Sequence, residues 1–426
     1  MEKKFLLVAV NMGYGHQRTA FPLRDWAVDG EVIMANDYVG MPERDRKIWQ
    51  SIRRGYEFVS RFKRVPLIGE AVFFIMDRFQ KIFPFYPKRD LSKPNTQLKQ
   101  TIATIKGGWG KDLIEKLKVK SQKLKVNLPI VSTFFTPAYM AEYFGYPGEI
   151  YCVVCDADIS RTWAPFEPQK SKIKYFAPTE RVVERLKLYG VKSENIFLTG
   201  YPLPLENLGD EDLTVLKSDV KNRLVNLDPQ KITCRLYQPL IKEYLTELPT
   251  QSNHPLTLLF SIGGAGAQKE IAEQLIKSLA EKIRKKQIKI ILSVGVKKEL
   301  KELFEKRTAG LGIEILWAEN CFEYFAKFNL ALRRTDILWT KPSELSFYAA
   351  LGLPIIIAPT IGSQEEFNER WLLKSGFGLK QENPKYADQW LFDWLNKGYL
   401  AEAALQGFVE GEKLGVFKIR KICSGC

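Results

Sequence analysis

The chain has 426 residues, 45% of them hydrophobic, and a formal net charge of +15 at pH 7. This length exceeds one ordinary core and predicts two domains of roughly 200 residues each. The positive charge favours an anionic partner, a class that includes phosphorylated substrates, acidic membrane surfaces and nucleic acids. No apolar stretch reaches the roughly 20 residues that span a bilayer, and the first apolar run is short, so we expect neither a transmembrane helix nor a signal peptide.

The first predicted element is a strand over residues 5–10, followed by the turn Gly13-Tyr14-Gly15-His16 and a helix. Glycines in such a turn let a ligand approach the backbone at the carboxyl end of the strand. His16 is one of only two histidines in the chain. Because imidazole titrates near neutral pH, His16 is a candidate general base. A capping or core histidine is the alternative interpretation.

A second strand is expected at residues 31–35, and residues 44–89 then change in character. They hold twelve Lys or Arg, four acidic residues and ten aromatic residues, among them Trp49, Phe83, Phe85 and Tyr86. This mixture suits a helix at an anionic membrane surface, where cations meet lipid phosphates and rings enter the headgroup region. The alternative is an amphipathic helical pair that covers the sheet.

Further strands and helices alternate along the rest of the chain, which predicts an α/β fold. Strands are expected at residues 129–134, 149–154, 174–177 and 195–199, with a helix at 180–189 that Gly190 ends. Residues 206–254 are interpreted as a linker and insertion. A second α/β domain is expected to have strands at 256–262, 289–294, 313–317, 337–339 and 354–358 and a long helix at 269–285.

The cysteines include two Cys-x-x-Cys pairs, Cys152/Cys155 and Cys423/Cys426. The first pair lies in an expected strand, where positions three apart point to opposite faces and cannot readily hold one ion. The second pair needs a partner pair to form a metal site. We therefore expect reduced thiols and no metal centre.

The second domain contains the pattern expected of a phosphate site. Gly263, Gly264 and Gly266 lie between a strand and a long helix, where backbone N–H groups at the helix N-terminus bind a pyrophosphate. A merely tight turn is the alternative. Polar residues follow the later strands, and their carboxylate, amide and hydroxyl groups suit ribose and sugar hydroxyls. These residues are Thr340, Glu344, Gln364 and Glu365.

Taken together, these motifs resemble the two-domain inverting glycosyltransferases of the GT-B type. The similar members are lipid II N-acetylglucosaminyltransferase, monogalactosyldiacylglycerol synthase and the processive diacylglycerol glycosyltransferases. The motifs that carry the resemblance are the Gly-x-Gly-His turn at residues 13–20, the strand ending at Asp156 with Thr162-Trp163 downstream, the Thr-Gly-x-Pro turn at 199–202, and residues 263–266, 340–341, 352–354 and 364–368 in the family's order.

The resemblance implies two Rossmann-like domains that face a cleft. An acceptor-binding domain would comprise residues 1–205 and a donor-binding domain residues 255–390, with a helical segment, 391–426, returning to the first domain. The expected activity is transfer of a sugar, with inversion, from a UDP-sugar to a diacylglycerol-like lipid. The enzyme would need neither metal nor cofactor, and it would lie in the cytoplasm, peripherally on the inner face of the membrane.

The resemblance also implies roles for single residues. His16 would accept the proton of the acceptor hydroxyl, with Asp156 as the competing base, and Gly13, Gly15 and Trp163 would line the acceptor site. Gly263, Gly264 and Gly266 would hold phosphates, Gln364 and Glu365 the sugar, and Thr340 would belong to the same donor site. Phe347 occupies the position of the family's ribose-binding Glu, and Glu344, one helical turn earlier, is the candidate replacement. Ser160 and Arg161 stand where the family often has a histidine.

Three alternatives stay open at this stage. Asp156-Ala157-Asp158 matches the Asp-x-Asp pair with which other glycosyltransferases hold a divalent ion. A chain that lacks the ribose carboxylate could also bind a nucleotide-sugar or lipid without turnover, or use a non-lipid acceptor. Binding to nucleic acid is the third alternative, although no recognisable motif accompanies the charge.

Overall fold

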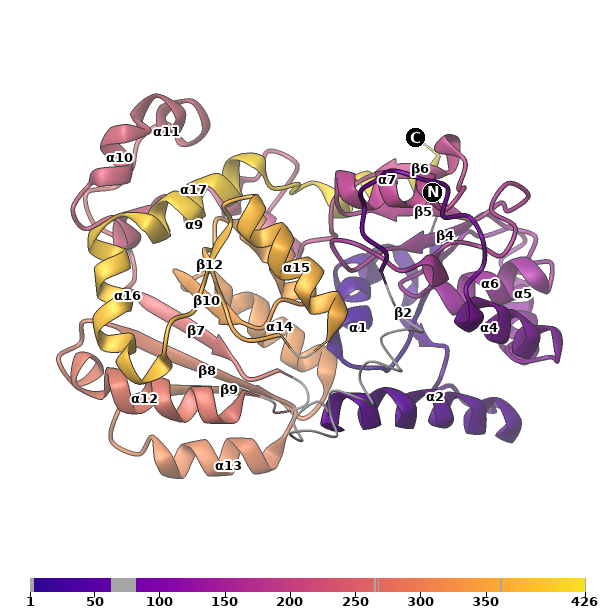
Figure 1. Ribbon diagram of the computed structural model, residues 1–426, viewed down its shortest axis with the longest axis horizontal. Helices are drawn as coiled ribbons and strands as arrows, with labels where there is room; N and C mark the ends of the chain where they lie inside the picture. The colour runs from indigo at the N-terminus through magenta and orange to yellow at the C-terminus, as the bar shows by residue number, and fades with distance from the viewer. Residues whose placement is uncertain (1–3, 63–81, 264–265, 267, 361, 426) are drawn as a thin grey trace. The chain divides into compact units, whose positions relative to one another are not determined.

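The computed structural model describes residues 4–62, 82–263, 266, 268–360 and 362–425 (Figure 1). The chain forms two compact units. Unit 1 comprises Met1–Pro202, Ile361–Phe367 and Leu414–Cys426, and unit 2 comprises Leu203–Thr360 and Asn368–Lys413. Among the described residues, no helix is both long and apolar enough to cross a bilayer.

Unit 1 is built on a six-stranded sheet in the order β2-β1-β3-β4-β5-β6, and every neighbouring pair is parallel. The central strands are short, apolar runs that are buried on both faces, as a parallel sheet covered by helices requires. The strands are β1 (Phe5–Ala9), β2 (Ala27–Met34), β3 (Ile130–Ser132), β4 (Ile150–Val153), β5 (Lys174–Ala177) and β6 (Ile196–Leu198).

Helices connect these strands and cover the sheet. Asn95 and Thr179 cap two of them, because each side chain accepts a hydrogen bond from a backbone N–H of the first turn. The helices are α1 (Tyr14–Ala20), η1 (Phe21–Trp26), α2 (Glu43–Phe62), α4 (Thr96–Lys106), α5 (Lys111–Lys123), α6 (Phe135–Tyr143), η2 (Arg161–Trp163), α7 (Glu180–Leu188), η3 (Ser193–Asn195) and α18 (Gly415–Ser424).

Part of the segment 44–89 belongs to the hydrophobic core of unit 1. Trp49 is 4% exposed and its ring lies 4.8 Å from the ring of Trp109. Phe85 is 9% exposed and the guanidinium of Arg181 lies 3.7 Å from its centroid. For these two rings, the expectation of a membrane-facing aromatic is wrong, because they are buried against other parts of unit 1. Phe83 and Tyr86 are 42% and 67% exposed, and residues 63–81 of the segment lie outside the described residues.

Unit 2 is built on a second parallel six-stranded sheet in the order β12-β11-β10-β7-β8-β9. The chain begins in the middle, at β7, and winds outward first in one direction and then in the other, which is the doubly wound Rossmann order. The strands are β7 (Thr257–Ser261), β8 (Lys289–Gly295), β9 (Glu314–Trp317), β10 (Ile337–Thr340), β11 (Ile355–Ile357) and β12 (Gly378–Lys380). The predicted α/β fold with two Rossmann-like domains is therefore confirmed.

Helices surround the sheet of unit 2 (Figure 1), and α12 packs on β8, η5 and α16. The helices are α8 (Leu205–Leu208), α9 (Thr214–Leu227), α10 (Ile232–Leu236), α11 (Gln238–Leu245), α12 (Lys269–Arg284), α13 (Lys298–Arg307), α14 (Cys321–Leu332), η4 (Glu344–Leu351), α15 (Ser363–Lys374), η5 (Pro384–Tyr386), α16 (Ala387–Asn396) and α17 (Tyr399–Glu410).

The division of the chain differs from the expected boundaries at two places. Most of the stretch 206–254 is helical and belongs to unit 2, because α9 buries Leu216, Val220 and Leu224 there and packs on α17. Within residues 391–426, only the part from Leu414 onward belongs to unit 1.

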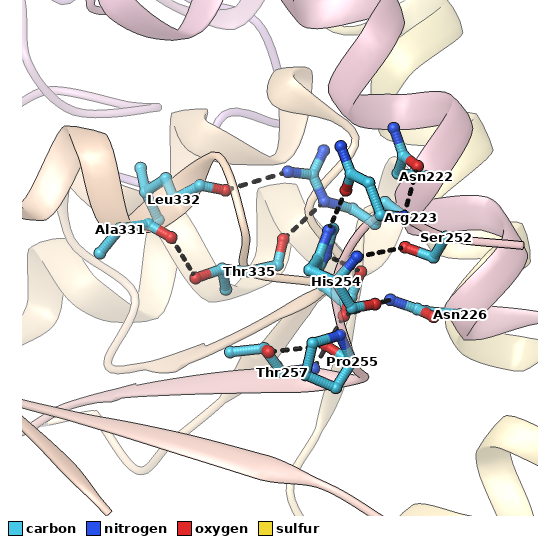
Figure 2. A network of polar contacts seen from close by, with 12 residues as sticks. Asn222, Arg223, Asn226, Ser252, His254, Pro255, Thr257, Ala331, Leu332 and Thr335 are labelled. Atoms are coloured by element: carbon cyan, nitrogen blue, oxygen red, sulfur yellow. Dashed lines mark hydrogen bonds and ion pairs between the residues drawn. The ribbon is translucent and has the colours of Figure 1, made fainter.

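A buried polar network joins the segment before β7 to the segment before β10 (Figure 2). The Asp336 carboxylate is fully buried and accepts hydrogen bonds from the Thr257 backbone N–H, at 2.8 Å, and the Asn226 amide, at 3.0 Å. The His254 Nε2 atom lies 3.1 Å from the same carboxylate. Burial raises the pKa of Asp336, and the hydrogen bond with His254 opposes that rise. Neighbouring Arg223 donates to three main-chain carbonyl oxygens. The second histidine thus has a structural place at the amino end of the sheet.

Candidate functional site

Each unit has a topological switch point, where neighbouring strands continue in opposite directions along the sheet. In unit 1 this point lies between β1 and β3, because β2 follows on the other side of β1. In unit 2 it lies between β7 and β10. Open α/β sheets bind ligands in the crevice beyond the carboxyl ends of such strands. The glycine turn with His16 follows β1, the turn with Gly263 and Gly266 follows β7, and Thr340 ends β10, so these motifs lie at the two switch points.

His16 lies in the first helix after β1, and its ring is held by the loop that follows β3. The Nδ1 atom is 2.8 Å from the Thr133 carbonyl oxygen. Since a carbonyl oxygen only accepts hydrogen bonds, Nδ1 carries the hydrogen, and in the neutral ring the lone pair is on Nε2. The Phe134 ring packs edge-on at 4.7 Å from the imidazole. His16 is thus a half-buried histidine whose tautomer is fixed, with the lone pair of the neutral ring on Nε2.

Backbone geometry explains why glycine occupies one of the two glycine positions beside His16. Gly13, at the N-cap of α1, has φ 99° and ψ −178°, a region that is essentially restricted to glycine. The Asn36 side chain fixes the same turn, because it accepts from the Asn11 N–H at 2.8 Å and donates to the Asn11 carbonyl at 3.1 Å. Gly15 is an ordinary helical residue of α1, and its carbonyl accepts a hydrogen bond from the Thr19 hydroxyl.

The other two predicted residues of unit 1 follow β4. Asp156 is half-buried. Trp163 is 2% exposed and packs against Phe135, 5.3 Å away between ring centroids, behind the half-buried Phe134. The Tyr175 hydroxyl donates to the Trp163 carbonyl at 2.8 Å, which fixes this loop. Trp163, Phe134 and Phe135 thus form an aromatic cluster beside His16. Phe134, which no sequence motif indicated, is the most exposed ring of this cluster.

Asp158 does not fit the role of a metal ligand. Its carboxylate receives two hydrogen bonds from the Arg185 guanidinium, at 2.8 and 2.7 Å. The side chains of Asp158 and Arg185 are only 7% and 0% exposed, so the pair is a buried structural ion pair. One of the two carboxylates that an Asp-x-Asp metal site needs is therefore already bound by Arg185. Across the part of the chain that the structure describes, no group of His, Cys, Asp and Glu side chains forms a metal site.

The glycine turn of unit 2 lies beside two lysines. Gly263 and Gly266 have φ of 78° and 70°, and the Gly266 N–H donates to the Gly263 carbonyl at 3.0 Å. A Cβ atom added to Gly263 would lie 3.6 Å from Lys341 Cε, and one added to Gly266 would lie 3.5 Å from Lys297 Nζ. Lys341 follows β10 and Lys297 follows β8, the two neighbours of β7. Positive side chains thus reach the turn from both sides, which suits an anion. Gly264 lies outside the described residues.

The remaining donor-site candidates are distributed over two places. Thr340 ends β10 and Glu344 begins η4, and they are 1% and 9% exposed. Phe347 is buried, and its ring lies 5.2 Å from that of Trp371, so it contributes to the core. Gln364 and Glu365 are half-buried residues at the start of α15, in the stretch that belongs to unit 1. The structure therefore does not group these last two residues with the glycine turn of unit 2.

Comparison with known proteins gives the following similarities. A family described as "Domain of unknown function (DUF6938)" matches residues 249–312 and 297–369, and no curated protein matches the chain. MurG from Acinetobacter baumannii is 11% identical over 99% of this chain and 100% of its own, with a TM-score of 0.47. UDP-GlcNAc 2-epimerase from Methanocaldococcus jannaschii, in complex with UDP-GlcNAc and UDP, is 15% identical over 99% of both chains, with a TM-score of 0.46. Anabaena HepE, in complex with UDP and glucose, is 13% identical over 99% of this chain and 98% of its own, with a TM-score of 0.45. Similarities this low do not define a substrate or a reaction.

Proposed function

We propose that this chain is an inverting, metal-independent hexosyltransferase that moves a sugar from a UDP-sugar to a diacylglycerol-like lipid. The acceptor would bind in unit 1 and the donor in unit 2. The observation that carries the proposal is the contact between His16 Nδ1 and the Thr133 carbonyl. It leaves the basic nitrogen of the ring at Nε2, at the ligand-binding edge of the first sheet. The motif resemblance supports the same assignment.

In the proposed reaction, His16 Nε2 accepts the proton of the acceptor hydroxyl as its oxygen attacks the anomeric carbon. The bond between that carbon and the diphosphate oxygen breaks on the opposite face, which inverts the configuration. UDP leaves with the electron pair. The N-terminal amides of α12, together with Lys341 and Lys297, stabilise the negative charge that develops on the diphosphate.

The lipid acceptor is supported by the exposed part of segment 44–89. Phe83 and Tyr86 are exposed rings, and Ile52, 39% exposed on α2, lies beside the exposed Arg53 and Arg54. Exposed apolar and cationic side chains together favour binding to an anionic surface. This surface leads us to propose a cytoplasmic protein that binds peripherally to the inner face of the membrane. Sedimentation with vesicles that contain anionic lipid tests this part. Loss of binding in the charge-reversed variant Arg53→Glu/Arg54→Glu supports it, and equal binding by both proteins contradicts it.

The activity is tested with UDP-sugars labelled in the sugar and vesicles that contain diacylglycerol. We expect a labelled glycolipid that forms without added divalent cation. Binding of UDP in a thermal-shift assay without transfer to any acceptor would instead support a nucleotide-sugar-binding protein without turnover. Binding raises the melting temperature by mass action whether or not the sugar is transferred, so the melting temperature reports binding and the labelled glycolipid reports turnover.

A further inference from the structure

A sulfur atom lies between the two residues that the motifs suggest as alternative bases. Cys155 Sγ is 3.4 Å from His16 Nδ1 and 4.0 Å from Asp156 Oδ2. Cys155 lies two residues after the end of β4 and is 4% exposed. The thiol is therefore a buried group of the site itself, although the sequence pattern gives it no role.

The hydrogen-bonding capacities of the three groups are complementary. Nδ1 carries a hydrogen, since it faces the Thr133 carbonyl, and the same N–H can be shared with the sulfur, which is a weak acceptor. The thiol hydrogen is a weak donor and has the Asp156 carboxylate within reach. The contacts thus run from the imidazole through the thiol to the carboxylate, while the Thr133 carbonyl keeps the ring in place.

We propose that Cys155 is a positioning residue whose thiol couples His16 to Asp156. On this view the two residues are a coupled pair instead of competing bases, which rests on the proposed function of His16. The thiol keeps its hydrogen and no covalent bond forms. When Nε2 takes up a proton, the new charge on the ring strengthens the N–H to sulfur contact, which in turn polarises the S–H bond toward the carboxylate.

The surroundings of His16 make this coupling measurable. Thr133 and Phe134, from the loop after β3, and Trp163, from η2, contact its ring, and none of these three ionises near neutral pH. On α1 itself the nearest charged residue is Arg18, two positions further along, where a helical side chain points away from that of His16. From the loop after β4, Cys155 Sγ contacts the ring, and Asp156 Oδ2 lies 4.0 Å from that sulfur.

The test is a double-mutant cycle read by the NMR titration of His16. The chain has two histidines, so the variant His254→Gln assigns both signals. The titration midpoint of His16 is measured in the wild type, Cys155→Ala, Asp156→Asn and the double variant. We expect Cys155→Ala to shift the midpoint by about half a pH unit, the size appropriate to a weak sulfur hydrogen bond. We also expect the effect of Asp156→Asn to fall by at least half when the thiol is absent.

Two further variants control for structural effects. Cys152→Ala removes a fully buried thiol three residues earlier, on β4, and should leave the His16 midpoint unchanged. Cys155→Val fills more of the buried space than alanine, so it tests the coupling even where alanine leaves unit 1 unfolded.

An effect of Asp156→Asn that is equal with and without the thiol would overturn the proposal, and so would equal shifts in Cys155→Ala and Cys152→Ala. The titration needs no substrate. A coupled pair in a protein that transfers no sugar would therefore refute the proposed function and support this inference. Sugar transfer by a protein in which His16 and Asp156 are not coupled would support the proposed function and refute this inference.

Discussion

The buried ion pair between Arg185 and Asp158 allows a quantitative prediction about stability. Replacing Arg185 by methionine leaves the Asp158 carboxylate buried, where it still accepts a hydrogen bond from the Ile159 N–H at 2.9 Å. Two charge-assisted hydrogen bonds are lost. Breaking one side of such a pair costs about 3–5 kcal/mol, because the remaining charge stays out of water. We therefore expect Arg185→Met to destabilise unit 1 by about that amount.

Hydrogen exchange of peptides from β5 and α7 measures this effect in unit 1 separately from unit 2. The matched control is the double variant Arg185→Met/Asp158→Leu, which removes both charges and should recover most of the loss. A loss below about 1 kcal/mol in the single variant would refute the reasoning, since that is the range of exposed pairs. Equal instability of the single and double variants would also contradict it, because the cost would then come from packing.

Three further predictions concern other sites. Arg334, through its hydrogen bonds, lowers the pKa of Glu314. The stability that this pair gives unit 2 is therefore present above about pH 4.3 and is lost as the pH falls through the lowered pKa. Urea unfolding between pH 3 and 7 should show this loss of stability, and the variant Glu314→Gln should not show it. Gly13→Ala should destabilise unit 1 by about 1–3 kcal/mol in thermal unfolding, because its backbone conformation is essentially restricted to glycine; an unchanged melting temperature would contradict this. Lys341→Ala and Lys297→Ala should each weaken UDP binding about tenfold in calorimetry, the effect of one charge-assisted contact, and unchanged affinity in both would place the diphosphate elsewhere.

The main elements of the fold could be predicted from the sequence because strand and helix signals were strong and local. The expected strand at 256–262 is β7, Thr257–Ser261, and the helix at 269–285 is α12, Lys269–Arg284. β12 was missed because Gly378–Lys380 is only three residues long and carries no alternating pattern. Such an edge strand is defined by pairing with β11, which is a tertiary property.

The candidate sites were only partly predictable. Glycine turns and a rare histidine give local signals, so the positions of His16 and Gly263 could be proposed. Lys341 belongs to the 340–341 motif, but neither it nor Lys297 could be assigned to the glycine turn, because lysine is common in this chain and only the order of the strands brings both to one turn. Composition likewise could not separate the buried Trp49 from an interfacial aromatic, since its partner, Trp109, is 60 positions further along the chain.

The most direct test of the central claim compares wild type and His16→Ala in transfer of labelled sugar from a UDP-sugar to diacylglycerol. Loss of a general base lowers the rate by about 100-fold or more, whereas UDP affinity should be unchanged because the predicted diphosphate contacts lie in unit 2. Full turnover by His16→Ala would contradict the account.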